Sequence, residues 1–249
     1  MKRSAVRPSP LFLSLLAATA AGAALTVVEA EFAVVAGTVL FVLGGWAVSL
    51  CLHEFGHAAV AYKGGDSSVA DKGYLTLDIR RYTDPVLSFV LPLVLLAFGG
   101  IPLPGGAVWI NHHALRSKRV ESMVSLAGPV SNLLLGVLLA GSVLVFNPPV
   151  GLASALSYLA FVQIIAFVLN ILPIPGLDGW GVIEPYLPPR AQQFGAKVRP
   201  WAPLVLFAVL IGFPTVAVLF FDLAGSVFGL VGGYIGLADY GQSNFMFWR

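Results

Sequence analysis

The sequence predicts an all-α polytopic membrane protein, with about six transmembrane helices and a small re-entrant β-loop. Of its 249 residues, 58% are hydrophobic and only 10% are charged, and the mean hydropathy is +0.88. A soluble domain is about 25% charged, so most of this apolar surface must face lipid rather than a single soluble core. The net charge of +2 is small and does not bear on nucleic-acid binding. The sequence has no basic tract with interleaved aromatic residues, so we do not expect a nucleic-acid-binding protein.

Six apolar stretches approach the length of about 20 residues that a bilayer-spanning helix requires. They cover 10–30, 32–60, 122–146, 151–172, 201–221 and 223–238. The first follows Lys2, Arg3 and Arg7 and contains many small residues, so it is either a retained helix, which we expect, or a cleavable signal peptide. The last stretch is short and rich in glycine.

A further apolar stretch, 86–110, is interrupted by Pro92, Pro102, Pro104 and two Gly-Gly pairs. No straight helix tolerates this spacing of proline and glycine. Irregular backbone occurs at membrane depth only where protein or a water-filled cavity covers it. We therefore expect a re-entrant or hairpin segment here. Because no loop is long enough for a separate soluble domain, residues 1–249 are expected to form a single membrane-embedded domain.

The basic residues support this segmentation. If the N-terminus is cytoplasmic and the six segments alternate, all 14 Lys and Arg residues fall in 1–9, 61–121, 173–200 and the C-terminal tail, on the cytoplasmic side. The opposite side receives only Glu29, Glu31, Asp222 and an uncharged turn at 147–149. This distribution agrees with the positive-inside rule. It predicts a multi-pass protein of the cell membrane with a cytoplasmic N-terminus.

The sharpest chemical signal is the pentapeptide HEFGH at 53–57. His53 and His57, four residues apart, share one helix face, so their ring nitrogens can converge on a zinc ion. Glu54 can contact a water on that metal and act as general base. The preceding run 41–52 has no ionisable side chain except the thiol of Cys51, which we interpret as a small buried hydrophobe. Three ionisable residues inside a spanning helix need compensation, which a divalent ion provides.

A tetrahedral zinc site needs a third protein ligand. Asp178 is the better candidate, because the predicted topology places it near the same cytoplasmic helix ends as His57. Its carboxylate also offsets part of the ion's charge in a low-dielectric site. His112 and His113 precede a basic stretch and are expected to be solvated or interfacial, and Glu184 is the competing carboxylate.

With these residues the sequence resembles the site-2 proteases, a family of intramembrane zinc metalloproteases. The pentapeptide resembles the family's HExxH, and NILPIPGLDG at 170–179 resembles its NxxPxPxLDG element. LAGPVSN at 126–132 is similar to AGPxxN, and PLPGGAVWI at 102–110 is similar to the re-entrant β-loop that lies along the substrate. We expect a catalytic core at about 40–182, with peripheral helices at about 10–30 and 201–238 that match no motif.

The resemblance implies one zinc ion per chain and Asp178 as its third ligand. It implies a second catalytic residue, Asn170, which steadies the substrate or the oxyanion. It also implies substrate contacts at Gly105, Gly106 and Asn132. For the two glycines a simple turn is the alternative, and for the asparagine a structural hydrogen bond. For Gly128 and Pro129, in the stretch similar to AGPxxN, the alternative to a functional role is a kink or close helix packing.

The activity implied is that of an endopeptidase that cleaves transmembrane segments in regulated intramembrane proteolysis. Its substrate would be a single-span regulator in the lipid bilayer, already trimmed by another protease. Many relatives carry a PDZ domain between the motif regions, whereas this chain has only the turn 147–150 there, so it resembles the compact form. Two alternatives are a membrane metal transporter and an inactive relative that binds membrane proteins. The complete set of candidate ligands and base argues against the second.

Overall fold

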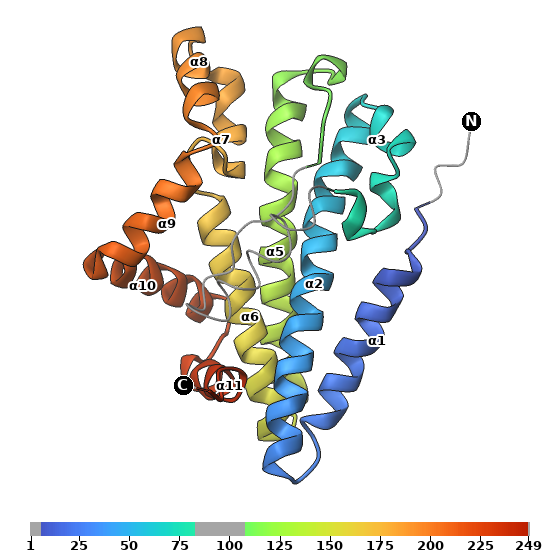
Figure 1. Ribbon diagram of the computed structural model, residues 1–249, viewed down its shortest axis with the longest axis vertical. Coiled ribbons are helices and arrows are strands. Elements are labelled where there is room, and N and C mark those ends of the chain that lie inside the picture. The colour runs from blue at the N-terminus through green and yellow to red at the C-terminus, as the bar shows by residue number, and fades with distance from the viewer. Residues whose placement is uncertain (1–5, 83–107, 249) are drawn as a thin grey trace.

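The computed structural model describes residues 6–82 and 108–248, and the secondary structure in this part of the chain is helical. Three helices, α2 (Glu31–Gly64), α5 (Lys118–Phe146) and α6 (Val150–Asn170), run side by side as the central bundle (Figure 1). Among the described residues, these three are long and apolar enough to cross a membrane alone, and two bent helix pairs raise the number to at most five. The all-α membrane fold is thus confirmed, whereas six spans are not.

Shorter elements surround this bundle. They are α1 (Pro10–Leu25), α3 (Ser68–Asp71), α7 (Asp178–Ile183), α8 (Pro189–Val198), α9 (Ala202–Gly212), α10 (Pro214–Leu230) and α11 (Ile235–Phe245), with 3-10 turns η1 (Tyr74–Thr76), η2 (Ile79–Arg81), η4 (His112–Ala114) and η5 (Glu184–Tyr186). Helix α1 packs along α2, and α9 to α11 lie on the other flank, against α6 (Figure 1). Of the three long helices, α6 is the most central. In its apolar 18-residue stretch 72% of the residues are buried, compared with 22% in that of α5.

The predicted helices 201–221 and 223–238 are wrong as continuous spans. The first is broken at Pro214, which lacks an N–H for the helical ladder, and Phe213 before it takes an extended conformation with φ −125° and ψ 93°. The second region contains Gly232 with φ +86°, and there α11 bends away from α10 by 119°. Proline and glycine therefore divide this apolar region into short helices that pack against the bundle.

The C-terminal tail was expected on the basic side of the protein, and for the described residues this prediction is wrong. Gly241 of α11 packs directly on the backbone of Ser154, at the beginning of α6. The rings of Phe245 and Tyr158 lie 5.6 Å apart, centroid to centroid. The breaks in the α9–α11 region explain this outcome, because the chain no longer has a straight span that would return it to the basic end.

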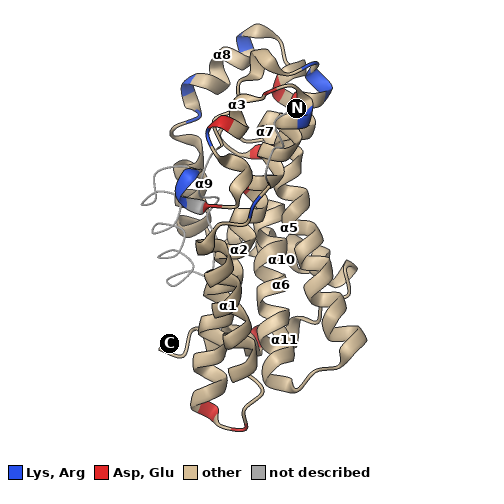
Figure 2. Cartoon of the chain, turned by 90° about the vertical axis from the view of Figure 1, so that its right-hand side faces the viewer, with Lys and Arg blue, Asp and Glu red and all other residues tan. Residues whose placement is uncertain are grey.

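The charges of the described residues are otherwise separated as predicted. Figure 2 shows Lys and Arg gathered toward the end of the bundle that carries α3, α7 and α8. At the opposite end, the connection between α1 and α2 carries the acidic residues Glu29 and Glu31, and α11, which packs near that end, carries Asp239. The re-entrant β-loop is not confirmed. Residues 86–107 of that segment lie outside the described part, and 108–110 have no regular secondary structure.

Glycine allows α1 and α2 to approach at backbone distance. A Cβ atom added at Gly22 of α1 would lie 2.8 Å from Phe41 Cα and 2.9 Å from Gly37 O, both on α2. Only a residue without a side chain fits at this crossing. Small residues of this kind drive helix association in membranes, where lipid removes most of the hydrophobic driving force.

We expect Gly22→Ala to separate α1 from α2 and to lower the free energy of unfolding by about 1–3 kcal/mol through overpacking. Thermal unfolding in detergent measures the change. Gly229→Ala in α10 is the matched control, because nothing lies within 4 Å of the added Cβ there. Equal melting temperatures for the two variants would contradict the close crossing of α1 and α2.

Candidate metal centre

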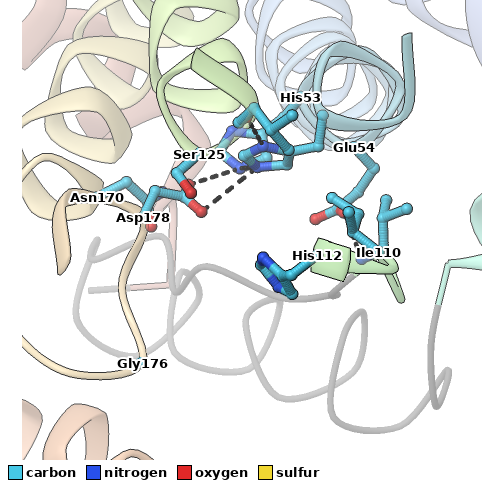
Figure 3. Close-up of a pocket in the computed structure, with 11 residues that line it drawn as sticks. His53, Glu54, Ile110, His112, Ser125, Asn170, Gly176 and Asp178 are labelled. Atoms are coloured by element: carbon cyan, nitrogen blue, oxygen red, sulfur yellow. Dashed lines mark hydrogen bonds and ion pairs between the residues drawn. The ribbon is translucent and has the colours of Figure 1, made fainter. Parts of the chain in front are cut away.

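Two histidines and one aspartate converge beside α5. His53 and His57 lie one turn apart on α2, with their Nε2 atoms 3.1 Å from each other. Asp178 Oδ2 lies 3.1 Å from His53 Nε2, and Asp178 Oδ1 lies 3.4 Å from His57 Nε2 (Figure 3). Their three ligand atoms all lie within 4.8 Å of one another. Within residues 6–82 and 108–248, these three residues are the group of His, Cys, Asp and Glu that could hold a metal ion. The structure therefore brings together the three side chains that were predicted as metal ligands.

The loop after α6 delivers Asp178 to this position. Helix α6 ends at Asn170, and Gly176, with φ +97°, reverses the chain so that α7 begins at Asp178. Gly179 packs on the carbonyl oxygens of Ile171 and Leu172, where any Cβ atom would collide. The glycines on both sides of the aspartate are thus required by backbone geometry, which gives a physical reason for the spacing of this element.

Each histidine is oriented by a hydrogen bond at its other ring nitrogen. His57 Nδ1 donates to the backbone carbonyl of Val124 at 2.7 Å, and His53 Nδ1 donates to Asn132 Oδ1 at 2.5 Å. Both rings then present Nε2 to Asp178. Histidines that bind metal commonly donate their second N–H to a carbonyl or amide oxygen in this way. Two imidazoles and one carboxylate, with both tautomers fixed, form a donor set that fits zinc.

Helix α5 passes directly over the histidines at Gly128. A Cβ atom at this position would collide with the Nε2 atoms of both His53 and His57. Close packing, the alternative stated for Gly128, is therefore what the structure shows, and the neighbour against which it packs is the metal centre itself. Pro129 follows inside the helix.

Glu54 lies next to this cluster and is 2% exposed. Its Oε2 accepts the backbone N–H of Val108 at 3.2 Å. Figure 3 shows its side chain directed toward the same cavity as the ligands, from the same helix as His53. Glu54 is thus placed to exchange protons with a water or a peptide in the cavity.

The segment 108–112, which forms one wall of the cavity, is hydrogen-bonded to the connection between α2 and α3 and to the residue that follows α3. Asn111 N–H donates to Asp66 Oδ2 at 2.7 Å, and Lys72 Nζ donates to the carbonyl of Trp109 at 3.0 Å. Burial by itself would raise the pKa of Asp66, but hydrogen bonds from Ser68 and Asn111 hold that pKa below its ordinary value. The carboxylate is therefore ionised at neutral pH, which keeps this anchor of the cavity wall intact.

The cavity has a volume of about 140 Å³. It is lined by all five predicted catalytic and ligand residues, His53, Glu54, His57, Asn170 and Asp178. Sequence reasoning missed Ser125, which also lines the cavity, and expected His112 to be solvated or interfacial. The side chain of His112 is 55% exposed, as expected, and pairs with Glu121 at 2.7 Å, but it also lies at the edge of the cavity.

The remaining candidates have other surroundings. Glu184, the competing carboxylate, forms an ion pair with Arg199 at 2.8 Å. Asn132, expected to contact substrate, is 4% exposed and makes the structural hydrogen bonds stated as its alternative, to His53 and to Gln163. Gly105 and Gly106 lie outside the described residues.

Comparison with known proteins identifies close relatives. No protein-family model and no solved structure matches the chain. "Putative zinc metalloprotease Rip2" of Mycolicibacterium smegmatis is 43% identical over 99% of this chain and 96% of its own length. The protein of the same name from Mycobacterium tuberculosis H37Rv is 46% identical over 99% and 96%. "Putative zinc metalloprotease YwhC" of Bacillus subtilis is 33% identical over 66% of this chain and 78% of its own length.

These relatives carry zinc metalloprotease names, and two of them match almost from end to end. The structure independently supplies a donor set that fits zinc, with a carboxylate beside it suited to act as a base. The apolar helices that hold the site are those of a membrane protein. The chain therefore belongs to the site-2 protease family and is a membrane zinc metalloprotease.

Proposed function

We propose that this metalloprotease cleaves peptide bonds inside the bilayer, within transmembrane segments of other proteins. The observation that carries the proposal is the depth of the site. His53 lies 64 − 53 = 11 residues before the end of α2, which is about 16 Å along a helix axis. Helix α2 has 34 residues, a length of about 51 Å. A bilayer core of about 30 Å centred on this helix would begin about 10 Å from that end and would contain the ligands. A site at this depth reaches peptide bonds that soluble proteases do not.

Each site residue has a distinct role in this proposal. His53, His57 and Asp178 would hold the zinc ion. Zinc bound there lowers the pKa of water and polarises a carbonyl group. Glu54 takes the proton of the attacking water and passes it to the leaving amine. The side-chain amide of Asn170, 3% exposed at the cavity, donates a hydrogen bond to the oxyanion.

The substrate must unwind before it is cut, because a helix shields its own peptide bonds. We propose that the segment around Gly105 and Gly106 offers a strand edge to the unwound chain, since a strand edge satisfies the freed backbone groups. The described end of this segment lies beside the proposed base, because the Val108 N–H donates to Glu54. Asn132 acts on the substrate only indirectly in this scheme, through His53.

The orientation follows from the charges. The basic end of the bundle faces the cytoplasm by the positive-inside rule, with the N-terminus on that side and the cavity nearer to it. Water enters past His112, whose side chain is half exposed at the cavity edge. The family resemblance favours a single-span regulator, already trimmed by another protease, as the substrate.

The first test compares Glu54→Gln and Asp178→Ala with the wild type in detergent, with zinc content and cleavage of a model transmembrane substrate as readouts. We expect about one zinc in the wild type. Glu54→Gln should keep zinc and lose cleavage by about 10²–10⁴-fold, because it removes only the base. Asp178→Ala should lose zinc and cleavage together. Cleavage by Glu54→Gln at the wild-type rate would overturn the role of Glu54 as base, whereas a zinc-loaded wild type that does not cleave would favour a transporter or binding role.

The second prediction concerns Gly128. Gly128→Ala should weaken zinc binding at least about 10-fold, because the added Cβ displaces both imidazoles. Gly141→Ala is the control on the same helix, since nothing lies within 4 Å of its added Cβ. Zinc titration of the two purified variants measures the difference. Equal affinities would show that α5 does not press on the ligands.

The third prediction concerns Asn170. Removal of one oxyanion donor lowers turnover by about 10²–10³-fold, so Asn170→Ala should lose kcat to this extent while it retains stoichiometric zinc. Single-turnover cleavage beside zinc analysis separates the two readouts. A variant with normal kcat would leave Asn170 without a role in the chemistry.

A further inference from the structure

A chain of buried polar side chains runs from α2 through α6 and α5 and returns to α2 at the metal centre. Gln163 Nε2 donates to Ser49 Oγ at 3.0 Å, and Asn132 Nδ2 donates to Gln163 Oε1 at 2.8 Å. Asn132 Oδ1 accepts from His53 Nδ1. All four side chains lie among the apolar helices, with exposed fractions between 1% and 6%. Sequence reasoning considered only the last link of this chain, at Asn132.

The direction of every hydrogen bond in the chain is fixed at its far end. The hydroxyl of Ser49 donates to the backbone carbonyl of Trp46 at 2.7 Å, and a carbonyl can only accept. Because the single hydroxyl proton is used there, Ser49 can only accept from Gln163. The amide N–H of Gln163 must therefore face Ser49, and its oxygen must face Asn132.

The same logic continues to the metal ligand. The oxygen of Gln163 requires an N–H from Asn132, which turns the oxygen of Asn132 toward His53. His53 must then carry its proton on Nδ1, and Nε2 retains its lone pair. The reverse polarity would place the proton on Nε2, which then could not bind a metal. A backbone carbonyl on α2 thus sets the tautomer of a histidine two helical turns further along.

His57 provides an internal comparison. Its Nδ1 donates directly to a backbone carbonyl, that of Val124, which can only accept. Asn132 next to His53 is ambiguous by itself, because an amide side chain can present either its oxygen or its N–H. Gln163 and Ser49 remove that ambiguity. Together they fix the tautomer of His53, as the carbonyl of Val124 alone fixes the tautomer of His57.

We propose that Gln163 and Ser49 are positioning residues that fix the zinc-binding tautomer and ring orientation of His53 through Asn132. The inference rests on the proposed ligation of zinc by His53. It assigns a role to a glutamine that lies inside an apolar spanning helix, where a buried polar side chain is costly without a purpose. The competing explanation is that the amides only hold α2, α5 and α6 together, as polar residues do between membrane helices.

Zinc affinity distinguishes the two explanations, measured by competition with a chromophoric chelator in detergent. We expect Gln163→Met and Ser49→Ala each to weaken zinc binding by about 10–100-fold, the usual effect of losing a residue that supports a ligand. Leu159→Ala is the control, because Leu159 packs on Gly45 at the same α2–α6 contact and makes no part of the polar chain. It should lower the melting temperature and leave zinc affinity unchanged.

Two further measurements test the relay directly. Nitrogen-15 spectra of the metal-free protein, recorded at an alkaline pH at which both imidazoles are neutral, should show one His53 tautomer, protonated at Nδ1, in the wild type and a mixture of tautomers in Ser49→Ala. The double variant Asn132→Ala/Gln163→Met should bind zinc no more weakly than Asn132→Ala, because Gln163 acts only through Asn132. A purely structural role predicts additive losses instead.

Zinc affinities within two-fold of the wild type for both Gln163→Met and Ser49→Ala would overturn this inference, as would a single unchanged tautomer in Ser49→Ala. Neither result would affect the proposed protease mechanism, which depends on Glu54→Gln and Asp178→Ala. Conversely, full zinc affinity in Asp178→Ala would contradict the proposed ligand set itself, independently of the role of Gln163 and Ser49. The two failures are therefore distinguishable.

Discussion

Two histidines and two carboxylates around one cavity are costly to place inside an apolar bundle, and many contacts in this structure offset that cost. A buried ionisable side chain needs a partner of opposite charge, a hydrogen bond or a metal ion. Here Asp178 meets both histidines, Glu54 accepts a backbone N–H, and each imidazole has an acceptor at Nδ1. A zinc ion completes this balance of charge, so the requirements of stability and of catalysis coincide.

The need to fit these side chains inside the bundle also explains where the backbone makes close contacts at glycine. Gly128 leaves room for two imidazoles beneath α5, and Gly179 lets the loop before α7 fold tightly enough to deliver Asp178. At both positions a methyl group would occupy space that the site needs. The glycines of this core are therefore determined by contact with specific atoms. Gly141 of α5, with open space around it, shows that glycine in these helices does not always carry such a constraint.

The outer helices are under different requirements. Helices α9, α10 and α11 contribute apolar packing against α6 and carry no ligand, so breaks at Pro214 and Gly232 are compatible with the site. In water, such breaks would expose backbone groups without much cost. In a membrane they need cover from neighbouring protein, and packing of this region on the bundle provides part of it. Hydropathy alone does not report such breaks, because every residue around them remains apolar.

The sequence by itself determined the membrane environment, the metal motif and the separation of charge, because these depend on composition and on spacing along one helix. It also indicated Asp178 as the third ligand, since topology alone placed that residue at the same end of the bundle as His57. Only the tertiary structure decided how Asn132 and Gln163 meet His53, because a contact between three helices depends on their rotation and depth. It also decided the course of α9 to α11, where local breaks at proline and glycine override a continuous apolar pattern.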